Sequence, residues 1–167
     1  IKVKPIWVDD TTRINIFLND GEGEFKLVNS GSKVEADQQE DMLQLFETAD
    51  DCDCLIISGS LPPGITPSYY ESILSICREK GIDVVLDISS PKLRDLLKYE
   101  PLLIKPNDEE IEEIFGIKIN DEEDIVHILS FLKEQGARNV LLTLGGKERI
   151  LAMERIFIIH LHNQLSY

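Results

Sequence analysis

Residues 82–107, IDVVLDISSPKLRDLLKYEPLLIKPN, contain the pattern that decides the fold. A short apolar run at 84–86 ends at Asp87, a helix is expected over about 91–98, and a second apolar run at 102–104 ends at Lys105. Short apolar runs between turn residues are typical of buried strands. A strand, a helix and a strand in this order indicate a parallel sheet with a right-handed crossover.

The same alternation of helices and strands continues on both sides of this stretch. The further expected elements are a helix over about 37–49, a strand at 54–57, a helix ending at Gly81, helices capped by Asn107 and Asp121, and a strand at 140–143. Four short apolar strands separated by helices predict an α/β fold, with a parallel-rich sheet that carries helices on both faces.

The first 34 residues have a different pattern. Apolar residues alternate with polar ones, which predicts strands near 2–8, 12–18 and 24–28. The Asn-Asp-Gly sequence at 19–21 is a hairpin turn signal. We therefore predict two domains: a small antiparallel β-lid at 1–34 and a partial α/β nucleotide-binding core at 35–167.

Composition excludes several functional classes. The net charge is -14 and no basic stripe is visible, so neither nucleic acid nor an anionic membrane surface is an expected partner. No apolar stretch approaches the length of about 20 residues that crosses a bilayer. Cys52, Cys54 and Cys77 are an odd number of cysteines in or beside apolar runs, which predicts buried, reduced thiols in a cytoplasmic protein.

Residues suited to phosphate chemistry follow the predicted strands. The strand ends carry residues 58–60 (SGS), Asp87, residues 105–107 (KPN) and residues 143–146 (TLGG). Carboxyl ends of parallel strands meet at one edge of a sheet, where ligands collect. Glycine amides, an amine and carboxylate or amide oxygens at one edge suit a phosphorylated ligand with a divalent metal.

Each motif also has a structural explanation. Asn107 and Glu110 would lie on one face of a helix start, where they could hold magnesium through water or form a capping box. Residues 59–64 (GSLPPG) could be a rigid loop that only launches the next helix. His160 and His162, in an apolar strand-like run, have no further candidate ligands and are expected to have no metal or catalytic role.

Four motifs in this order resemble the ribokinase-like (PfkB) carbohydrate kinases, in the 1-phosphofructokinase and tagatose-6-phosphate kinase branch. The matching segments are residues 12–15 (TRIN), 58–64 (SGSLPPG), 105–110 (KPNDEE) and 143–146 (TLGG). The resemblance covers about residues 1–147. It implies ATP-dependent phosphorylation of a sugar phosphate with Mg²⁺, and a lid that often joins two subunits, so that a homodimer through the lid is an expectation.

The resemblance also implies roles for individual residues. Arg13 and Asn15 would lie at the sugar's phosphate, where a planar guanidinium suits phosphate oxygens, and Ser60 would border the sugar. The nucleotide would be bound by Lys105, Asn107, Thr143 and Gly145. Asn107 and Glu110 would place magnesium through water.

Three departures from the family pattern put activity in doubt. The Gly-Gly-Lys-Gly sugar-binding turn and the strand before it do not occur, so the fold is expected to be incomplete at both ends. No Gly-x-Gly-Asp occurs, so the catalytic aspartate of the family's Gly-Ala-Gly-Asp motif has no counterpart. The sequence from Glu148 onward differs from the family's usual apolar strand.

Three hypotheses follow. The leading one is a kinase acting on fructose 1-phosphate, or on tagatose 6-phosphate or fructose 6-phosphate, present here as a nearly inert fragment. The second is a non-catalytic remnant that binds nucleotide or dimerises. The third is a relative of the adenosine or vitamin kinases, against which the phosphate-seeking Arg13 argues.

Overall fold

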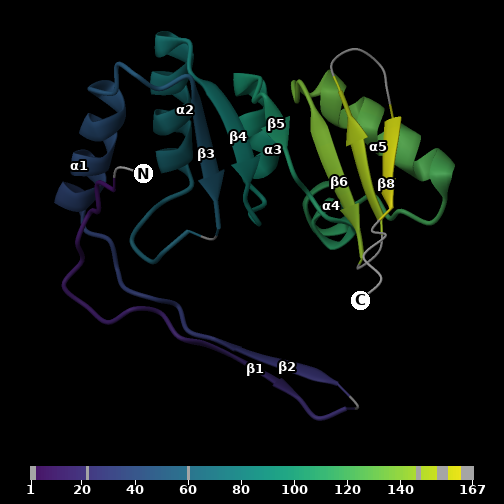
Figure 1. The fold of residues 1–167 in the computed structure, drawn as a ribbon, viewed down its shortest axis with the longest axis horizontal. Coiled ribbons are helices and arrows are strands. Elements are labelled where there is room, and N and C mark those ends of the chain that lie inside the picture. Colours follow the sequence, from purple (N-terminus) through teal and green to yellow (C-terminus); the bar gives the residue numbers. More distant parts are fainter. Residues whose placement is uncertain (1–2, 22, 60, 146–147, 154–157, 163–167) are drawn as a thin grey trace. The chain divides into compact units, whose positions relative to one another are not determined.

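The computed structural model describes residues 3–21, 23–59, 61–145, 148–153 and 158–162. The chain divides into two compact units, one of residues 1–49 and 61–69 and the other of residues 50–60 and 70–167 (Figure 1). The first unit contains a helix and residues 61–69 in addition to the β-element, and the predicted division after residue 34 stays a prediction.

The first unit contains a β-hairpin and one helix. Strands β1 (Asn15–Asn19) and β2 (Glu24–Val28) pair antiparallel, as expected from the turn signal. At the turn, Asn19 Oδ1 accepts a hydrogen bond from the amide of Gly21, whose φ of 86° favours glycine. Helix α1 (Ala36–Glu47) begins with a capping box between Glu35 and Gln38.

The prediction of a strand near residues 2–8 is wrong for its described part, residues 3–8, which are not a strand. Alternation alone supplied that prediction, but a strand also needs a neighbour for its backbone groups, and Pro5 has no N–H to offer. The strand expected at 12–18 is also shifted, because pairing begins at Asn15.

The second unit is built on a six-stranded sheet, which Figure 1 shows with its helices packed alongside. Its order is β3 (Cys54–Ser58), β4 (Asp83–Asp87), β5 (Leu103–Ile104), β6 (Val140–Leu144), β7 (Glu148–Ala152) and β8 (Ile158–His162). The first four strands are parallel, which confirms the predicted arrangement. The α/β class with a parallel-rich sheet and a small antiparallel element is therefore confirmed.

Strand β7 was not predicted, and the run that forms β8 was described from the sequence only as strand-like. They pair antiparallel with β6 and with each other, so the sequence from Glu148 extends the sheet. The strand β7 begins with polar residues, so its alternating apolar positions are not evident from the sequence. Two of these apolar positions are Ile150, which is fully buried, and Ala152, which is 7% exposed.

Helices connect the parallel strands and cover the sheet. They are α2 (Ser68–Lys80), α3 (Leu93–Leu96) with the 3₁₀ turn η1 (Leu97–Tyr99), α4 (Asp108–Phe115) and α5 (Glu122–Glu134). The predicted caps are confirmed: Asn107 and Asp121 accept backbone hydrogen bonds at the starts of α4 and α5, and Gly81 follows α2 with a φ of 70°. In the described part of the chain, no helix has the length and apolar character needed to span a bilayer.

The two faces of the sheet differ in burial. Leu86, Ile104 and Leu142 point to one face and are 1% exposed or less. On the other face, Val85 is half-buried and Ile56 is 67% exposed, so the described helices cover this second face only in part.

The cysteines are only partly as predicted. All three are free thiols, and Cys77 is fully buried inside α2. Cys54 is exposed and Cys52 is half-buried, so the expectation that all three are buried is wrong. Cys54 lies on the open face of β3, where apolar sequence did not ensure burial.

Candidate functional site

The carboxyl ends of β3, β4 and β5 bring together a lysine, an aspartate and a serine. Lys105 Nζ lies 2.9 Å from Asp87 Oδ1, and Ser58 Oγ lies 3.4 Å from Asp87 Oδ2. The parallel register produces this cluster, because it pairs Ser58 with Asp87. The backbone amide of Lys105 donates to Leu86, which continues the ladder to the same edge. The edge thus presents a cation beside a carboxylate, both about 40% exposed.

Asn107 and Glu110 form a reciprocal cap at the start of α4. Asn107 Oδ1 accepts from the Glu110 amide at 2.7 Å, and Glu110 Oε2 accepts from the Asn107 amide at 2.9 Å. Ser89, in the loop after β4, donates its hydroxyl hydrogen to Glu110 Oε1. The capping alternative considered from sequence is therefore present, and it fixes both side chains at the edge of the sheet.

Thr143 and Gly145 reach the same edge from β6. Thr143 forms an isolated parallel bridge with Asn107, and its amide donates to the Pro106 carbonyl at 3.1 Å. Gly145 has a φ of 51°, and a Cβ built there would meet no atom within 4 Å. A bulky ligand group can approach this backbone closely, because glycine has no side chain.

The residues at this edge fit a magnesium ion held through water. Carboxylate and amide oxygens are the ligands that hard cations prefer, and Mg²⁺ usually keeps several waters and binds few protein groups. The described residues contain no cluster of three or more His, Cys, Asp or Glu side chains that could enclose a metal. Any cation at Asn107 and Glu110 would therefore take its other ligands from water and a bound phosphate.

Three further site residues were predicted from the sequence. Arg13 and Asn15 belong to the first unit, where Arg13 packs against Gly31 and Asn15 begins β1. Ser60 lies outside the described residues. Within the second unit, the structure brings together Lys105, Asn107, Glu110, Thr143 and Gly145.

Sequence reasoning assigned no role to three groups of this cluster. Asp87 and Ser58 were placed at the sheet edge without a role, and Ser89 was not predicted there. Position immediately after a buried strand was the available signal for Asp87 and Ser58. His160 and His162 lie in β8 and their backbones pair with β7. The structure describes only the backbone of these two histidines.

Comparison with known proteins identifies the family. The family described as pfkB family carbohydrate kinase matches residues 1–156. The chain belongs to this family. The D-tagatose-1-phosphate kinase of Klebsiella oxytoca is 45% identical over 147 residues, which are 88% of this chain and 48% of that protein. The 1-phosphofructokinase of Bacillus subtilis is 32% identical over 86% of this chain and 47% of that protein.

Solved structures share this fold. Phosphofructokinase-2 from Escherichia coli, crystallised with substrates and products, superposes with a TM-score of 0.81 at 20% identity, over 93% of this chain and 51% of that one. At this identity the likeness supports the ribokinase-like fold alone. This pfkB chain spans about half the length of the curated relatives it matches.

Proposed function

We propose that this chain is part of a kinase that transfers the γ-phosphoryl group of ATP to a ketohexose phosphate. The observation that carries the proposal is the convergence of Lys105, Asn107, Thr143 and Gly145 at one sheet edge in a pfkB-family chain. Phosphoryl transfer needs positioned charge more than covalent chemistry, and this edge offers an ammonium group, polar oxygens and open backbone.

Each group has a distinct proposed role at the nucleotide. Lys105 faces the nucleotide phosphates, and its ammonium gives a charge-assisted hydrogen bond. Asn107, Thr143 and Gly145 line the same phosphates. Asn107 and Glu110 would hold Mg²⁺ through water, and the ion would offset the negative charge of the phosphates. The cap holds both side chains in place before the nucleotide arrives.

The sugar end of the proposal rests on residues outside this cluster. Arg13 binds the sugar's phosphate through its planar fork of donors, Asn15 lies beside it, and Ser60 borders the sugar. The names of the relatives narrow the choice of acceptor, because they include D-tagatose-1-phosphate kinases and 1-phosphofructokinases. We therefore favour fructose 1-phosphate or a related ketohexose phosphate.

Turnover by these 167 residues alone should be very slow. General acid–base catalysis contributes roughly 10²–10⁴-fold, and no Gly-x-Gly-Asp supplies the family's base in this sequence. The second candidate function is therefore a nucleotide-binding or dimerising protein without turnover. The cluster around Lys105 supports this second candidate equally, since nucleotide binding without turnover needs no catalytic base.

Calorimetric titration with ATP and Mg²⁺ tests the nucleotide proposal. Lys105→Ala should weaken binding by at least about tenfold, because a hydrogen bond to a charged group is lost. Lys98→Ala is the matched control, since it removes one exposed, ion-paired lysine from η1. Absence of ATP binding by the unaltered chain, or equal loss in both variants, would refute the assigned edge.

A coupled assay for ADP production distinguishes the two candidate functions. Product formed from ATP with fructose 1-phosphate or tagatose 1-phosphate, and lost in Lys105→Ala, supports the kinase. ATP binding without product supports the non-catalytic candidate. Product formed with neither sugar phosphate but with an uncharged sugar would overturn the role of Arg13.

We also propose that the β-lid mediates homodimerisation. Apolar side chains on both faces of the hairpin are exposed: Ile16, Phe17, Leu18, Phe25, Leu27 and Val28 have exposed fractions of 47–62%. Exposed apolar patches of this kind mark interaction sites. Sedimentation velocity should show a dimer that Phe17→Asp dissociates, while the exposed helix substitution Val126→Asp leaves it intact.

A further inference from the structure

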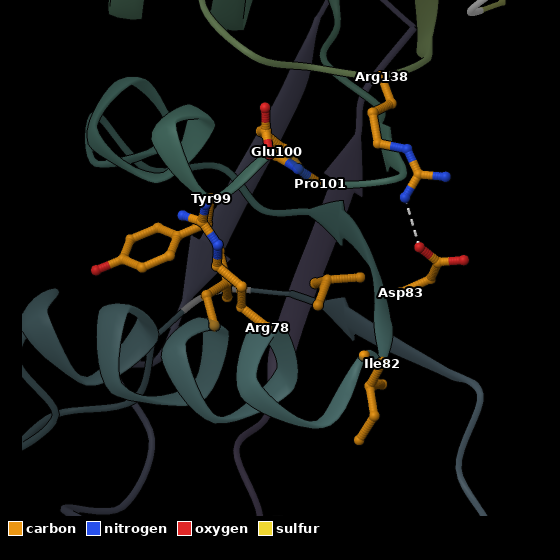
Figure 2. A pocket seen from close by; sticks show the side chains of 10 residues that line it. Arg78, Ile82, Asp83, Tyr99, Glu100, Pro101 and Arg138 are labelled. Carbon is orange, nitrogen blue, oxygen red and sulfur yellow. Dashed lines mark hydrogen bonds and ion pairs between the residues drawn. The ribbon is translucent and has the colours of Figure 1, made fainter.

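A second pocket lies at the opposite end of the sheet from the candidate phosphate site. Its volume is about 310 Å³, within the range of small-molecule sites. It is formed by α2, the start of β4, the loop after η1 and the loop before β6 (Figure 2). The lining residues on which the argument depends are Leu74, Arg78, Asp83, Val84, Glu100 and Arg138.

Two arginines face this pocket from different elements. Arg78 lies near the end of α2, and Arg138 precedes β6; Figure 2 shows them on opposite sides of the group of lining residues. Each guanidinium is a planar fork of donors that matches carboxylate and phosphate oxygens. Two such groups from separate segments are the chemistry of an anion site.

The acidic groups of the pocket do not cancel this preference. Arg138 Nη1 lies 2.6 Å from Asp83 Oδ1, so the Asp83 carboxylate is compensated within the fold. Glu100 is exposed to solvent, where screening weakens its repulsion. Arg78 therefore supplies the positive charge directed at a ligand, and the paired Arg138 supplies the opposite wall.

The apolar part of the pocket sets the kind of anion. The ring of Tyr99, which is partly exposed, forms part of the lining, and the mostly buried Leu74 and Val84 lie in the wall behind it. Apolar side chains favour a ligand with a carbon skeleton, since a bare inorganic ion gains nothing from them. The lining thus combines charged and apolar side chains.

Backbone hydrogen bonds fix the walls. The Arg138 amide donates to the Pro101 carbonyl at 3.0 Å, and the Glu100 amide donates to Leu97 at 2.9 Å. Gly136 lets the two loops approach so closely that a Cβ there would lie on the Leu97 carbonyl oxygen. A pocket with walls held in this way loses little entropy when it binds.

We propose that this pocket binds a small organic anion, a carboxylate or a phosphate ester with a short carbon skeleton. The site is separate from the proposed kinase edge. The two lie at opposite ends of β4, whose five residues extend over roughly 13 Å at about 3.3 Å per step. Occupancy of one site therefore leaves the other accessible.

Titration of the 167-residue chain with succinate and with glycerol 3-phosphate tests the proposal by calorimetry. We expect saturable binding of at least one, weakened tenfold or more by Arg78→Ala and several-fold tightened by Glu100→Gln. The first probe identifies a carboxylate ligand and the second a phosphate ester. Inorganic phosphate, which lacks a carbon skeleton, should bind more weakly than the better probe.

Two control variants separate this site from others. Arg94→Ala removes an exposed arginine that stacks on Phe115 outside the pocket, and it should leave binding unchanged. Lys105→Ala should also leave it unchanged, because it alters only the proposed nucleotide edge. The proposal is overturned if neither probe binds, if Arg78→Ala binds normally, or if Glu100→Gln weakens binding, since the last result indicates a cationic ligand.

Discussion

Lys105 Nζ lies 2.9 Å from Asp87 Oδ1, across two neighbouring parallel strands at the carboxyl edge of the sheet. Both side chains are about 40% exposed, so solvent screens the pair. The pair therefore affects the charge that an approaching ligand meets more than it affects the stability of the fold. A phosphate that approaches Lys105 also meets the Asp87 carboxylate.

Asp87→Asn should change the free energy of unfolding by no more than about 1 kcal/mol, because exposed ion pairs contribute little. The same variant should bind ATP more tightly, since a negative charge beside Lys105 is removed. Urea denaturation and calorimetry measure the two effects. Weaker ATP binding by Asp87→Asn would mean that the carboxylate helps to hold the nucleotide or its metal.

Asn107→Ala should destabilise the chain by about 1 kcal/mol, because α4 loses its N-terminal cap. Asn107→Asp should lower the free energy of unfolding by only a few tenths of a kcal/mol, since aspartate caps a helix as well as asparagine does. Asp121→Ala, which uncaps α5, is the control for cap loss without a ligand role. If Asn107→Asp retains stability but loses ATP binding, the side chain has a function beyond the cap.

Gly136→Ala should destabilise the chain by more than Gly116→Ala. Both glycines have positive φ, so each alanine pays the cost of a left-handed backbone, about 1 kcal/mol. At Gly136 the added Cβ would also collide with the Leu97 carbonyl oxygen, whereas at Gly116 it meets no atom within 4 Å. Thermal denaturation of both variants provides the comparison, and equal costs would mean that the loop relaxes freely.

Cys77 should resist alkylation in the folded chain, whereas exposed Cys54 should react. Burial raises the pKa of the Cys77 thiol, with a smaller contribution from Cys52, and the reactive thiolate is therefore suppressed. A raised folded-state pKa also means that stability falls as the pH rises above the ordinary thiol pKa, because the unfolded chain ionises first. Mass spectrometry after iodoacetamide treatment, with and without urea, measures this protection.

Much of the second unit was predictable because local signals agreed with burial. The apolar runs at β3 to β6 and the caps at Asn107 and Asp121 each act within a few residues. Convergence of Lys105, Asn107 and Thr143 followed from a general rule about strand ends. Strand β7 escaped prediction because Glu148 and Arg149 interrupt the apolar pattern.

Other features depend on contacts that sequence does not encode locally. The alternation before Pro5 predicted a strand, but pairing requires a partner that the pattern cannot specify. Asn107 and Glu110 were compatible with either a cap or a metal site, and only coordinates reveal the reciprocal hydrogen bonds. The pocket beside Arg78 is lined by four separate segments, so no single sequence motif predicts it.

The position of β3 at the end of the strand order has a practical consequence. Within the described residues its outer side pairs with no strand, and Ile56 is largely exposed. An unpaired strand edge can pair with extended segments of other protein molecules. We therefore expect this chain to aggregate more as its concentration rises. Preparations should be kept dilute, and a charged residue at Ile56 is the simplest way to protect them.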